Sequence, residues 1–282
     1  PAAARARGMT AARRVSIVVP CRNEVAHVDA FVAAALAQRL PADVTLELVV
    51  ADGASDDGTR ERLAALAVRE PRLTVIDNPQ RIVAAGLNRA LAAAHGDVVV
   101  RMDVHTTYAD DYVAQCLTAL ARTGADNVGG PWRAEGTGPW GRAIAAAFQS
   151  RWAAGGARSR SLTYDGPVDT VYLGSWPRAT FERFGGFDET LVRNQDDEHN
   201  LRIVRGGGRV WQSPAIRSTY HPRESLAAFA RQWLQYGYWK PFVMRKHGQP
   251  ASPRHLLPEA FVAALAGAAV AALLGLGVLP LA

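Results

Sequence analysis

The chain has 282 residues, of which 49% are hydrophobic and 21% are charged. This composition excludes an intrinsically disordered protein and a wholly membrane-embedded one, and the length allows one α/β domain with a large core plus an appendage. The net charge is +6, and its two cysteines, Cys21 and Cys116, form neither a disulfide framework nor a metal-ligand spacing, which fits a reducing cytosol.

The first half of the chain alternates apolar runs with helical patterns. After a disordered basic arm at residues 1–13, strands are expected at 15–20, 44–51, 73–77 and 97–103, with helices at about 25–38, 58–69, 82–94 and 110–122. This β-α-β-α order predicts the α/β class, with a doubly wound, mostly parallel sheet and right-handed crossovers.

Three of these strands run into acidic segments. The first is followed by Cys21-Arg22-Asn23-Glu24, the second ends at Asp52, and the fourth ends at Asp103 with His105 two residues later. Open α/β sheets bind ligands at the carboxyl ends of their strands. The acids favour a metal-bound polyphosphate over a hydride cofactor, and no Gly-x-Gly-x-x-Gly follows the first strand.

The second half has a less regular pattern. Strands are expected near 128–132 and 169–176, and helices at about 139–153, from Thr180 to Phe184 and at 195–206. An aromatic, basic helix follows from Ser225 to about His247. Residues 260–282 carry no charge and are long enough to cross a bilayer, which predicts a transmembrane helix with its basic flank in the cytoplasm. A buried soluble helix is the alternative.

Five segments in this order are similar to those of the family-2 inverting glycosyltransferases with a GT-A fold. They are Val-Pro-Cys-Arg-Asn-Glu at 19–24, Asp-Gly-Ala-Ser-Asp-Asp-Gly-Thr at 52–59, Asp-Val-His at 103–105, Gly-Gly-Phe-Asp-Glu at 185–189 and Gln-Asp-Asp-Glu at 195–198. The resemblance covers residues 14 to 247, and it is strongest to the succinoglycan-biosynthesis type of membrane-associated sugar transferase.

The resemblance implies a GT-A domain over 14–224, an interfacial helical segment over 225–259 and a membrane helix over 260–282. The implied activity is inverting transfer from a nucleoside diphosphate sugar, expected to be a UDP-sugar, to a lipid-linked or polysaccharide acceptor at the cytoplasmic membrane face. A non-catalytic nucleotide-sugar or glycan-binding protein on the same fold is the alternative. A nucleic-acid partner is not expected, because the basic segment carries no recognition motif.

Matching the family's motifs residue by residue gives a donor site. Asp103 and His105 would hold Mg²⁺ or Mn²⁺ carried by the diphosphate, and His105 stands where the family usually has Asp. Asp52 matches the nucleobase-binding Asp and Glu24 the residue near the ribose. The donor-binding set is completed by Pro20, Arg22 and Arg81. Asp56 and Asp57 are interpreted as turn and capping residues.

The acidic segment at 195–198 matches the family's Glu-Asp-x-Asp pattern. Asp196 takes the position of the catalytic base, Gln195 replaces the usual Glu, and Glu198 takes the second acid. Asp197 is an extra acid and competes with Asp196 for the role of base.

The aromatic helix supplies the predicted acceptor site. Gln235-x-x-Tyr238-Trp239 resembles the Gln-x-x-Arg-Trp motif of processive polysaccharide synthases, but the Arg is replaced, which argues against a processive enzyme. Gln235, Trp239 and Gly174 are the expected acceptor residues, with Lys240 facing the diphosphate. An interfacial helix with Trp and Tyr at headgroup level is a compatible alternative.

Overall fold

The computed structural model describes residues 14–150, 155–222, 225–249 and 256–275, so the predicted N-terminal arm at 1–13 lies outside the described residues. The first half of the described chain confirms the predicted alternation of strands and helices. Its elements are β1 (Arg14–Cys21), α2 (Val28–Leu36), β2 (Thr45–Asp52), α3 (Thr59–Arg69), β3 (Leu73–Asp77), α4 (Val83–Ala93), β4 (Val98–Arg101) and α5 (Tyr112–Thr123).

The second half adds shorter elements around the same sheet. They are β5 (Thr106–Tyr108), β6 (Asn127–Gly130), β7 (Arg133–Ala134), α6 (Gly138–Gln149), the 3₁₀ turn η1 (Arg158–Arg160), β8 (Gly166–Pro167), β9 (Tyr172–Pro177), α7 (Arg178–Phe184), α8 (Gln195–Arg205), β10 (Val210–Gln212) and β11 (Ser218–Tyr220).

The main sheet has the order β3-β2-β1-β4-β9-β6-β10-β8, and β5-β11-β7 form a separate small sheet. Strands β1, β2, β3 and β4 pair in parallel, whereas β9 runs antiparallel between β4 and β6. The predicted mostly parallel α/β architecture is therefore confirmed. The antiparallel β9 comes after the long segment that contains β5, α5 and α6. It joins the parallel half of the sheet, formed by β1 to β4, to the second half.

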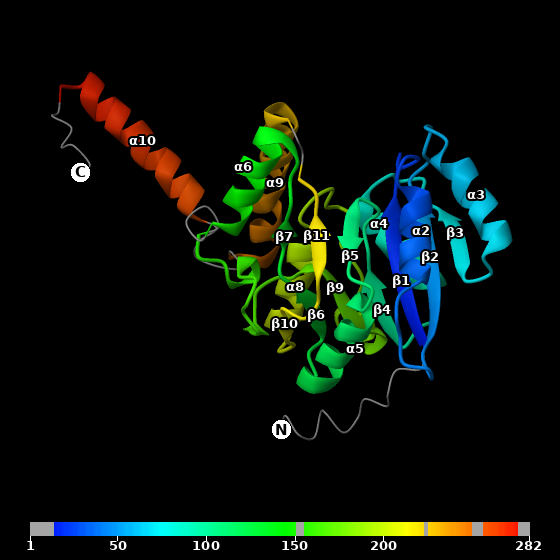
Figure 1. Cartoon of the computed structure of the whole chain (residues 1–282). Helices are drawn as coiled ribbons and strands as arrows, with labels where there is room; N and C mark the ends of the chain where they lie inside the picture. Colours follow the sequence, from blue (N-terminus) through cyan, green and yellow to red (C-terminus); the bar gives the residue numbers. More distant parts are fainter. Residues whose placement is uncertain (1–13, 151–154, 223–224, 250–255, 276–282) are drawn as a thin grey trace.

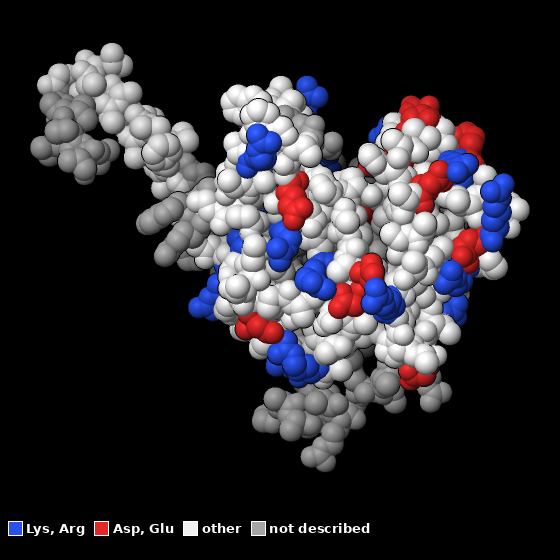
Figure 2. Space-filling view, in the orientation of Figure 1, with Lys and Arg blue, Asp and Glu red and all other residues white. Residues whose placement is uncertain are grey.

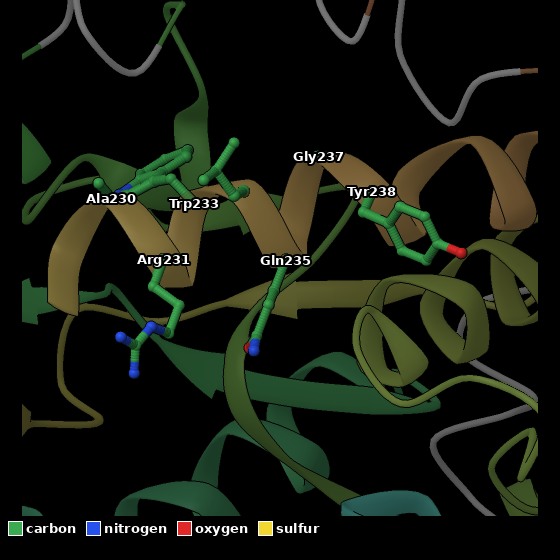
Figure 3. Close-up of a pocket in the computed structure, with 7 residues that line it drawn as sticks. Ala230, Arg231, Trp233, Gln235, Gly237 and Tyr238 are labelled. Carbon is green, nitrogen blue, oxygen red and sulfur yellow. The ribbon is translucent and has the colours of Figure 1, made fainter. Parts of the chain in front are cut away.

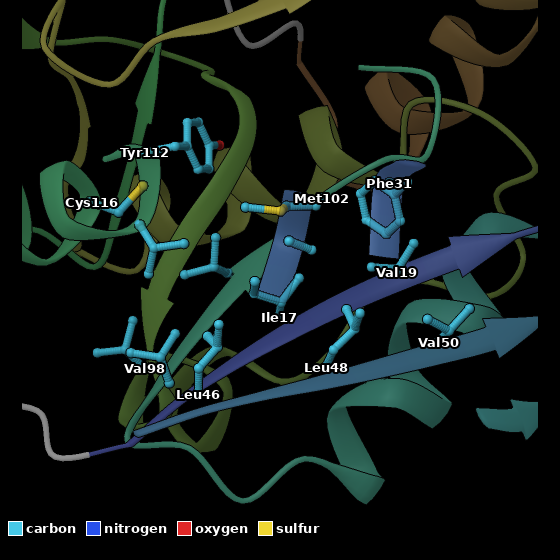
Figure 4. Packing of buried hydrophobic residues seen from close by; sticks show 14 of the residues in the cluster. Ile17, Val19, Phe31, Leu46, Leu48, Val50, Val98, Met102, Tyr112 and Cys116 are labelled. Carbon is cyan, nitrogen blue, oxygen red and sulfur yellow. The ribbon is translucent and has the colours of Figure 1, made fainter. Parts of the chain in front are cut away.

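Two apolar layers pack on opposite faces of the sheet, because successive strand side chains alternate between faces. Ile17 and Leu48 face a cluster that includes Phe31 of α2 and Tyr112 of α5 (Figure 4). Val18 faces the other cluster, which the helices α4, α7 and α8 cover. Since both faces are buried, the strands read as continuous apolar runs rather than as alternating ones.

Two helices end the described chain. Helix α9 (Leu226–His247) begins at Ser225, whose Oγ accepts a hydrogen bond from the Ala228 backbone N–H at 3.2 Å, and it ends at Gly248 in the left-handed conformation. Its buried residue Val243 packs with Leu191 and Leu201 near α8. Helix α9 thereby lies against the second half of the domain.

Helix α10 (Leu257–Leu273) projects away from the domain (Figure 1). Its large apolar side chains are exposed, including Phe261 at 64% and Leu273 at 87%. Figure 2 shows this helix without charged side chains along its outer length. Across the described segments, however, no helix is both long and apolar enough to span a bilayer. The predicted transmembrane helix is therefore not supported: α10 has 17 residues and is rich in small side chains, and 276–282 lie outside the described residues.

Candidate active site

The carboxyl ends of β1 and β2 meet at one edge of the sheet, because the register pairs Cys21 with Asp52. The loops that follow are joined by a reciprocal pair of bonds: Asn23 Nδ2 donates to Asp56, and the Asp56 backbone N–H donates to Asn23 Oδ1. Asp57 accepts from the Val25 N–H and from the Thr59 hydroxyl. This agrees with the turn and capping interpretation of Asp56 and Asp57.

Asp52 lies beneath these loops and is 1% exposed. Its two carboxylate oxygens accept from the hydroxyl and the backbone N–H of Ser55 at 2.5 and 3.2 Å. The loop after β2 is therefore shaped around the carboxylate of Asp52.

A cavity of about 1730 Å³ opens beside this edge. It lies between the end of β4 with the following loop on one side and α9 on the other. Among the predicted site residues, it is lined by Asp103, His105, Asp196 and Gln235, and also by the competing acid Asp197 and by Lys240. The structure thus brings the expected metal ligands, the expected base and one expected acceptor residue to a single space.

Arg101 also lines the cavity, and it lies between Asp103 and Asp196. Its Nε and Nη2 atoms donate to the two carboxylate oxygens of Asp103 at 3.2 and 3.1 Å, and its Nη1 lies 4.0 Å from Asp196 Oδ2. Although burial opposes it, the charges of Asp103 and Asp196 raise the pKa of Arg101. The guanidinium is therefore permanently charged. Sequence reasoning missed this residue; its signal is a cation that ends the apolar run Val98–Val100.

Asp196 is in the first turn of α8, and its side chain is 39% exposed while lining the cavity. Burial against the surrounding protein and the charge of Asp197 raise the pKa of Asp196, and Arg101 offsets part of this. A carboxylate with a raised pKa is a better proton acceptor near neutral pH. Asp196 therefore lines the cavity with a proton affinity above that of an ordinary aspartate.

Asp197 has different surroundings. Its Oδ2 accepts from Lys240 Nζ at 2.6 Å, in an ion pair where the two side chains are 28% and 19% exposed. Two further contacts tie α9 to the same loop: Asn194 Nδ2 donates to the Tyr236 carbonyl at 3.0 Å, and Arg193 Nε donates to Gln235 Oε1 at 3.1 Å. The ion pair between Asp197 and Lys240 thus links the start of α8 to α9.

Glu198 points away from the cavity and is 0% exposed. It accepts from Arg202 on its own helix and lies 3.0 Å from Lys246 Nζ and from His247 Nε2 at the end of α9. Although burial alone would raise it, these partners lower the pKa of Glu198. The second acid of the motif therefore joins α8 to α9.

The remaining predicted residues do not line the cavity. Glu24 is nearest, since its Oε1 lies 3.4 Å from His105 Nδ1 at the rim. Arg81 is exposed with a φ of 60°, and Trp239 packs against the cluster of Leu191, Leu201 and Val243. The others that do not line it are Pro20, Arg22, Asp52 and Gly174.

Gly174 has a structural requirement of its own. Its φ is 109°, and a Cβ there would lie 2.5 Å from the Trp176 ring. The neighbouring Tyr172 and Leu173 line the cavity instead.

Of the described side chains, Asp103 and His105 are the two expected ligands of a divalent cation. Among the residues that the structure describes, no group of three or more His, Cys, Asp or Glu side chains could hold a metal ion by itself. Asp103 and His105 both line the cavity, and Mg²⁺ carried by substrate phosphates usually needs only one or two protein carboxylates. The two residues therefore suit a cation that arrives with the diphosphate.

The sequence model of glycosyl transferase family 2 matches residues 16–176 of the chain. The chain belongs to glycosyltransferase family 2. The match covers β1 to β9, and it includes Asp52, Asp103 and His105 but ends before Asp196.

Two curated relatives extend the similarity beyond that range. The succinoglycan biosynthesis protein ExoA of Rhizobium meliloti (strain 1021) is 32% identical over 266 residues, which are 94% of this chain and 80% of the relative. A dolichyl N-acetyl-alpha-D-glucosaminyl phosphate 3-beta-D-2,3-diacetamido-2,3-dideoxy-beta-D-glucuronosyltransferase of Methanococcus voltae is 23% identical, covering 82% of this chain and 74% of that one.

A solved structure is also similar in fold. The mannosyltransferase PcManGT from Pyrobaculum calidifontis, in complex with GDP-Man and Mn²⁺, aligns with a TM-score of 0.72 and 24% identity, over 96% of this chain and 78% of its own. This likeness establishes the GT-A-like fold. The protein is thus a family-2 glycosyltransferase that uses nucleotide sugars.

Proposed function

We propose that the protein transfers one sugar, with inversion, from a nucleoside diphosphate sugar to the hydroxyl of a lipid-linked or polysaccharide acceptor. The single observation that carries the proposal is the cavity in which Asp103 and Asp196 lie on two sides of Arg101. In this proposal Asp103 serves the donor diphosphate and Asp196 serves the acceptor hydroxyl. A single displacement needs one proton acceptor, and Asp196 is that group.

In the proposed reaction, the acceptor oxygen attacks the anomeric carbon while the bond from that carbon to the diphosphate oxygen breaks. Asp196 takes the proton of the acceptor hydroxyl, and the leaving oxygen keeps the bonding electron pair. Asp103 and His105 would hold a divalent cation whose charge neutralises the leaving diphosphate when it is bound. Lys240 holds Asp197 in an ion pair, which leaves Asp196 as the acid that faces the acceptor.

The donor base is proposed to be uracil, since Asp52 matches the family's nucleobase-binding Asp. Both carboxylate oxygens of Asp52 already accept hydrogen bonds from Ser55. The loop at 53–55 would therefore have to move for the Asp52 carboxylate to accept a hydrogen bond from the base. The guanosine nucleotide bound by PcManGT makes a GDP-sugar the competing donor.

The acceptor is proposed to be presented at the cytoplasmic face of the cell membrane. A shallow groove of about 870 Å³ runs along α9 and is lined mainly by apolar residues such as Trp233, Leu234 and Tyr238 (Figure 3). Arg231 and Gln235 project from one side of the same helix. Helices with aromatic and basic side chains of this kind lie at bilayer surfaces. We therefore propose surface attachment through α9 and α10 rather than a membrane span.

The proposal is tested by incubating the purified protein with UDP- and GDP-sugars and a lipid-linked acceptor, with Mg²⁺, Mn²⁺ or EDTA. Metal-dependent release of the nucleoside diphosphate, together with a glycosylated product of inverted anomeric configuration, supports it. Nucleotide-sugar binding without transfer to any acceptor would instead indicate a binding protein on this fold.

A further inference from the structure

Arg101 is a buried cation at the point where the two halves of the reaction meet. It ends the apolar strand β4, and it is 7% exposed. Burying a guanidinium is costly unless well-placed carboxylates and hydrogen bonds compensate for the lost hydration. The two carboxylates that supply this compensation belong to Asp103 and Asp196.

The two edges of the guanidinium are used differently. The edge formed by Nε and Nη2 makes a paired contact with both oxygens of Asp103. The Nη1 atom is buried and has no hydrogen-bond partner among the described residues, and it lies 4.0 Å from Asp196 Oδ2. That separation exceeds the range of a hydrogen bond, although buried N–H groups are nearly always satisfied.

The surroundings of Asp103 keep it fixed on the other side. The Asp103 backbone N–H donates to Tyr108 Oη at 2.7 Å, and Tyr108 Oη donates to the Asp103 carbonyl at 3.1 Å. Catalytic hydrogen bonds are often long before substrates bind and shorten in the complex. The acid nearest to Nη1 is Asp196, which lines the cavity: its Oδ1 accepts from the Asp197 backbone N–H at 2.9 Å, and its Oδ2 faces Nη1 at 4.0 Å.

We propose that Arg101 is a positioning residue of the transfer reaction: one edge of its guanidinium fixes Asp103, and the other receives Asp196. The two acids are thereby kept at a set separation across the cavity. This inference rests on the proposed function, because it assigns Asp103 to the donor and Asp196 to the acceptor. Arg101 acts through these carboxylates and does not touch the reacting atoms.

The test compares Arg101→Lys and Arg101→Gln with Arg122→Gln, which removes a half-exposed cation paired with Asp165 on the surface. A lysine keeps the charge but cannot offer two edges at once. At saturating donor, we expect Arg101→Lys to lower kcat about 10- to 100-fold, which is typical when reacting groups are misplaced by about 1 Å. Arg122→Gln should leave kcat unchanged.

A double-mutant comparison separates positioning from a structural role. In the Asp196→Asn background, Arg101→Lys should lower kcat by a smaller factor than in the wild type, because one of the two carboxylates through which it acts is gone. Equal fold losses in the two backgrounds, with a lowered melting temperature, would overturn the proposal. If Arg101→Gln does not fold, the Lys variant provides the comparison alone.

A readout that needs no transfer distinguishes failure of this inference from failure of the proposed function. In ¹³C-aspartate-labelled protein at one pH, the carboxyl resonances of Asp103 and Asp196 are assigned with Asp103→Asn and Asp196→Asn. Both should move in Arg101→Lys and neither in Arg122→Gln. An unmoved Asp196 resonance would contradict the inference even in an active enzyme. Moved resonances in a protein that transfers no sugar would contradict the proposed function alone.

Discussion

Asp196 and Asp197 are neighbours in the sequence, but their environments differ. Both line the cavity, but Asp197 is bound to Lys240, whereas Asp196 has a raised pKa and faces Arg101. The motif placed both acids in one helical turn, and only the fold distinguishes them, because Lys240 lies 43 residues away in sequence. Arg101 could not be assigned from the sequence for the same reason: its partners come from two separate elements.

The raised pKa of Asp196 predicts the pH dependence of the reaction. The base must be ionised to accept a proton, so the rate should fall as pH decreases through a pKa above the ordinary value of about 3.9. The measurement is kcat against pH at saturating donor, with Asp197→Asn as the comparison. Because Asp197 contributes to the shift, that variant should move the acidic limb to lower pH. An acidic limb that Asp197→Asn leaves in place would contradict this cause.

The same shift has a consequence for stability. A carboxyl whose pKa is raised in the folded state favours folding when protonated, and this contribution is lost as pH rises through the folded-state pKa. Asp196→Asn removes that unfavourable charge at neutral pH. It also removes one of the two carboxylates that face buried Arg101, so we expect its melting temperature at pH 7 to stay close to that of the wild type. A clear decrease in a thermal scan would show that ionised Asp196 stabilises the fold.

The metal ligands proposed from the sequence make a separate prediction. Asp103→Ala should abolish transfer and weaken nucleoside diphosphate binding, since it removes a carboxylate ligand and leaves Arg101 without its paired acceptor. His105→Asp should retain activity with a preference moved from Mn²⁺ toward Mg²⁺, because a carboxylate is a harder ligand than an imidazole. Titration of activity with each metal checks both variants, and full activity in EDTA would contradict the assignment.

At the scale of elements, α8 and α9 form one unit around buried Glu198. Arg202, Lys246 and His247 all contact this carboxylate, and Lys246 also binds Asp188. The sequence predicted both helices and their approximate ends. It named Trp239 as the aromatic residue of the acceptor site, whereas Trp233 lines the cavity and Trp239 packs against the cluster of Leu191, Leu201 and Val243. Trp239 comes six positions after Trp233, and at about 3.6 residues per turn this spacing puts the two side chains on different faces of α9.

Glu198→Gln tests this unit. Removing the charge leaves Arg202 and Lys246 without their shared carboxylate, and because these two cations are partly exposed, at 26% and 43%, the cost is about 1.5 to 3 kcal/mol. We expect a loss of that order in the free energy of unfolding measured with urea. Asp110→Asn is the matched control, because the Asp110–Arg39 pair is exposed at 69% and 77% and should contribute within about 0.5 kcal/mol. A similar small loss for Glu198→Gln would contradict a joining role.

At the scale of the whole molecule, the catalytic domain and the projecting α10 make separate contributions. The parallel half of the sheet could be predicted from β-α alternation, because continuous apolar runs require helices on both faces, but the strand order could not. Whether the C-terminal segment spans a membrane could not be predicted. A run rich in Ala and Gly is long enough to cross a bilayer, but it has little apolar area per residue. The helix α10 has few large side chains, and those are exposed.

Deletion from Ala260 onward tests the surface attachment. Since the side chains of α10 beyond that point are largely exposed, the shortened protein should keep its melting temperature and its affinity for the nucleotide sugar. It should lose most of its binding to anionic phospholipid vesicles and use lipid-linked acceptor poorly. Vesicle flotation of both proteins is the measurement. Equal flotation of the two would remove α10 from the account.

The central claim is that Asp196 is the base of an inverting transfer, and the kcat of Asp196→Asn beside Asp197→Asn tests it most directly. The Asn side chain is nearly isosteric, so donor affinity by calorimetry should hardly change in either variant. Loss of general-base assistance should lower kcat of Asp196→Asn by about 10²- to 10⁴-fold or more, while Asp197→Asn should retain much more activity. An inactive Asp197→Asn with an active Asp196→Asn, or two active variants, would contradict the account.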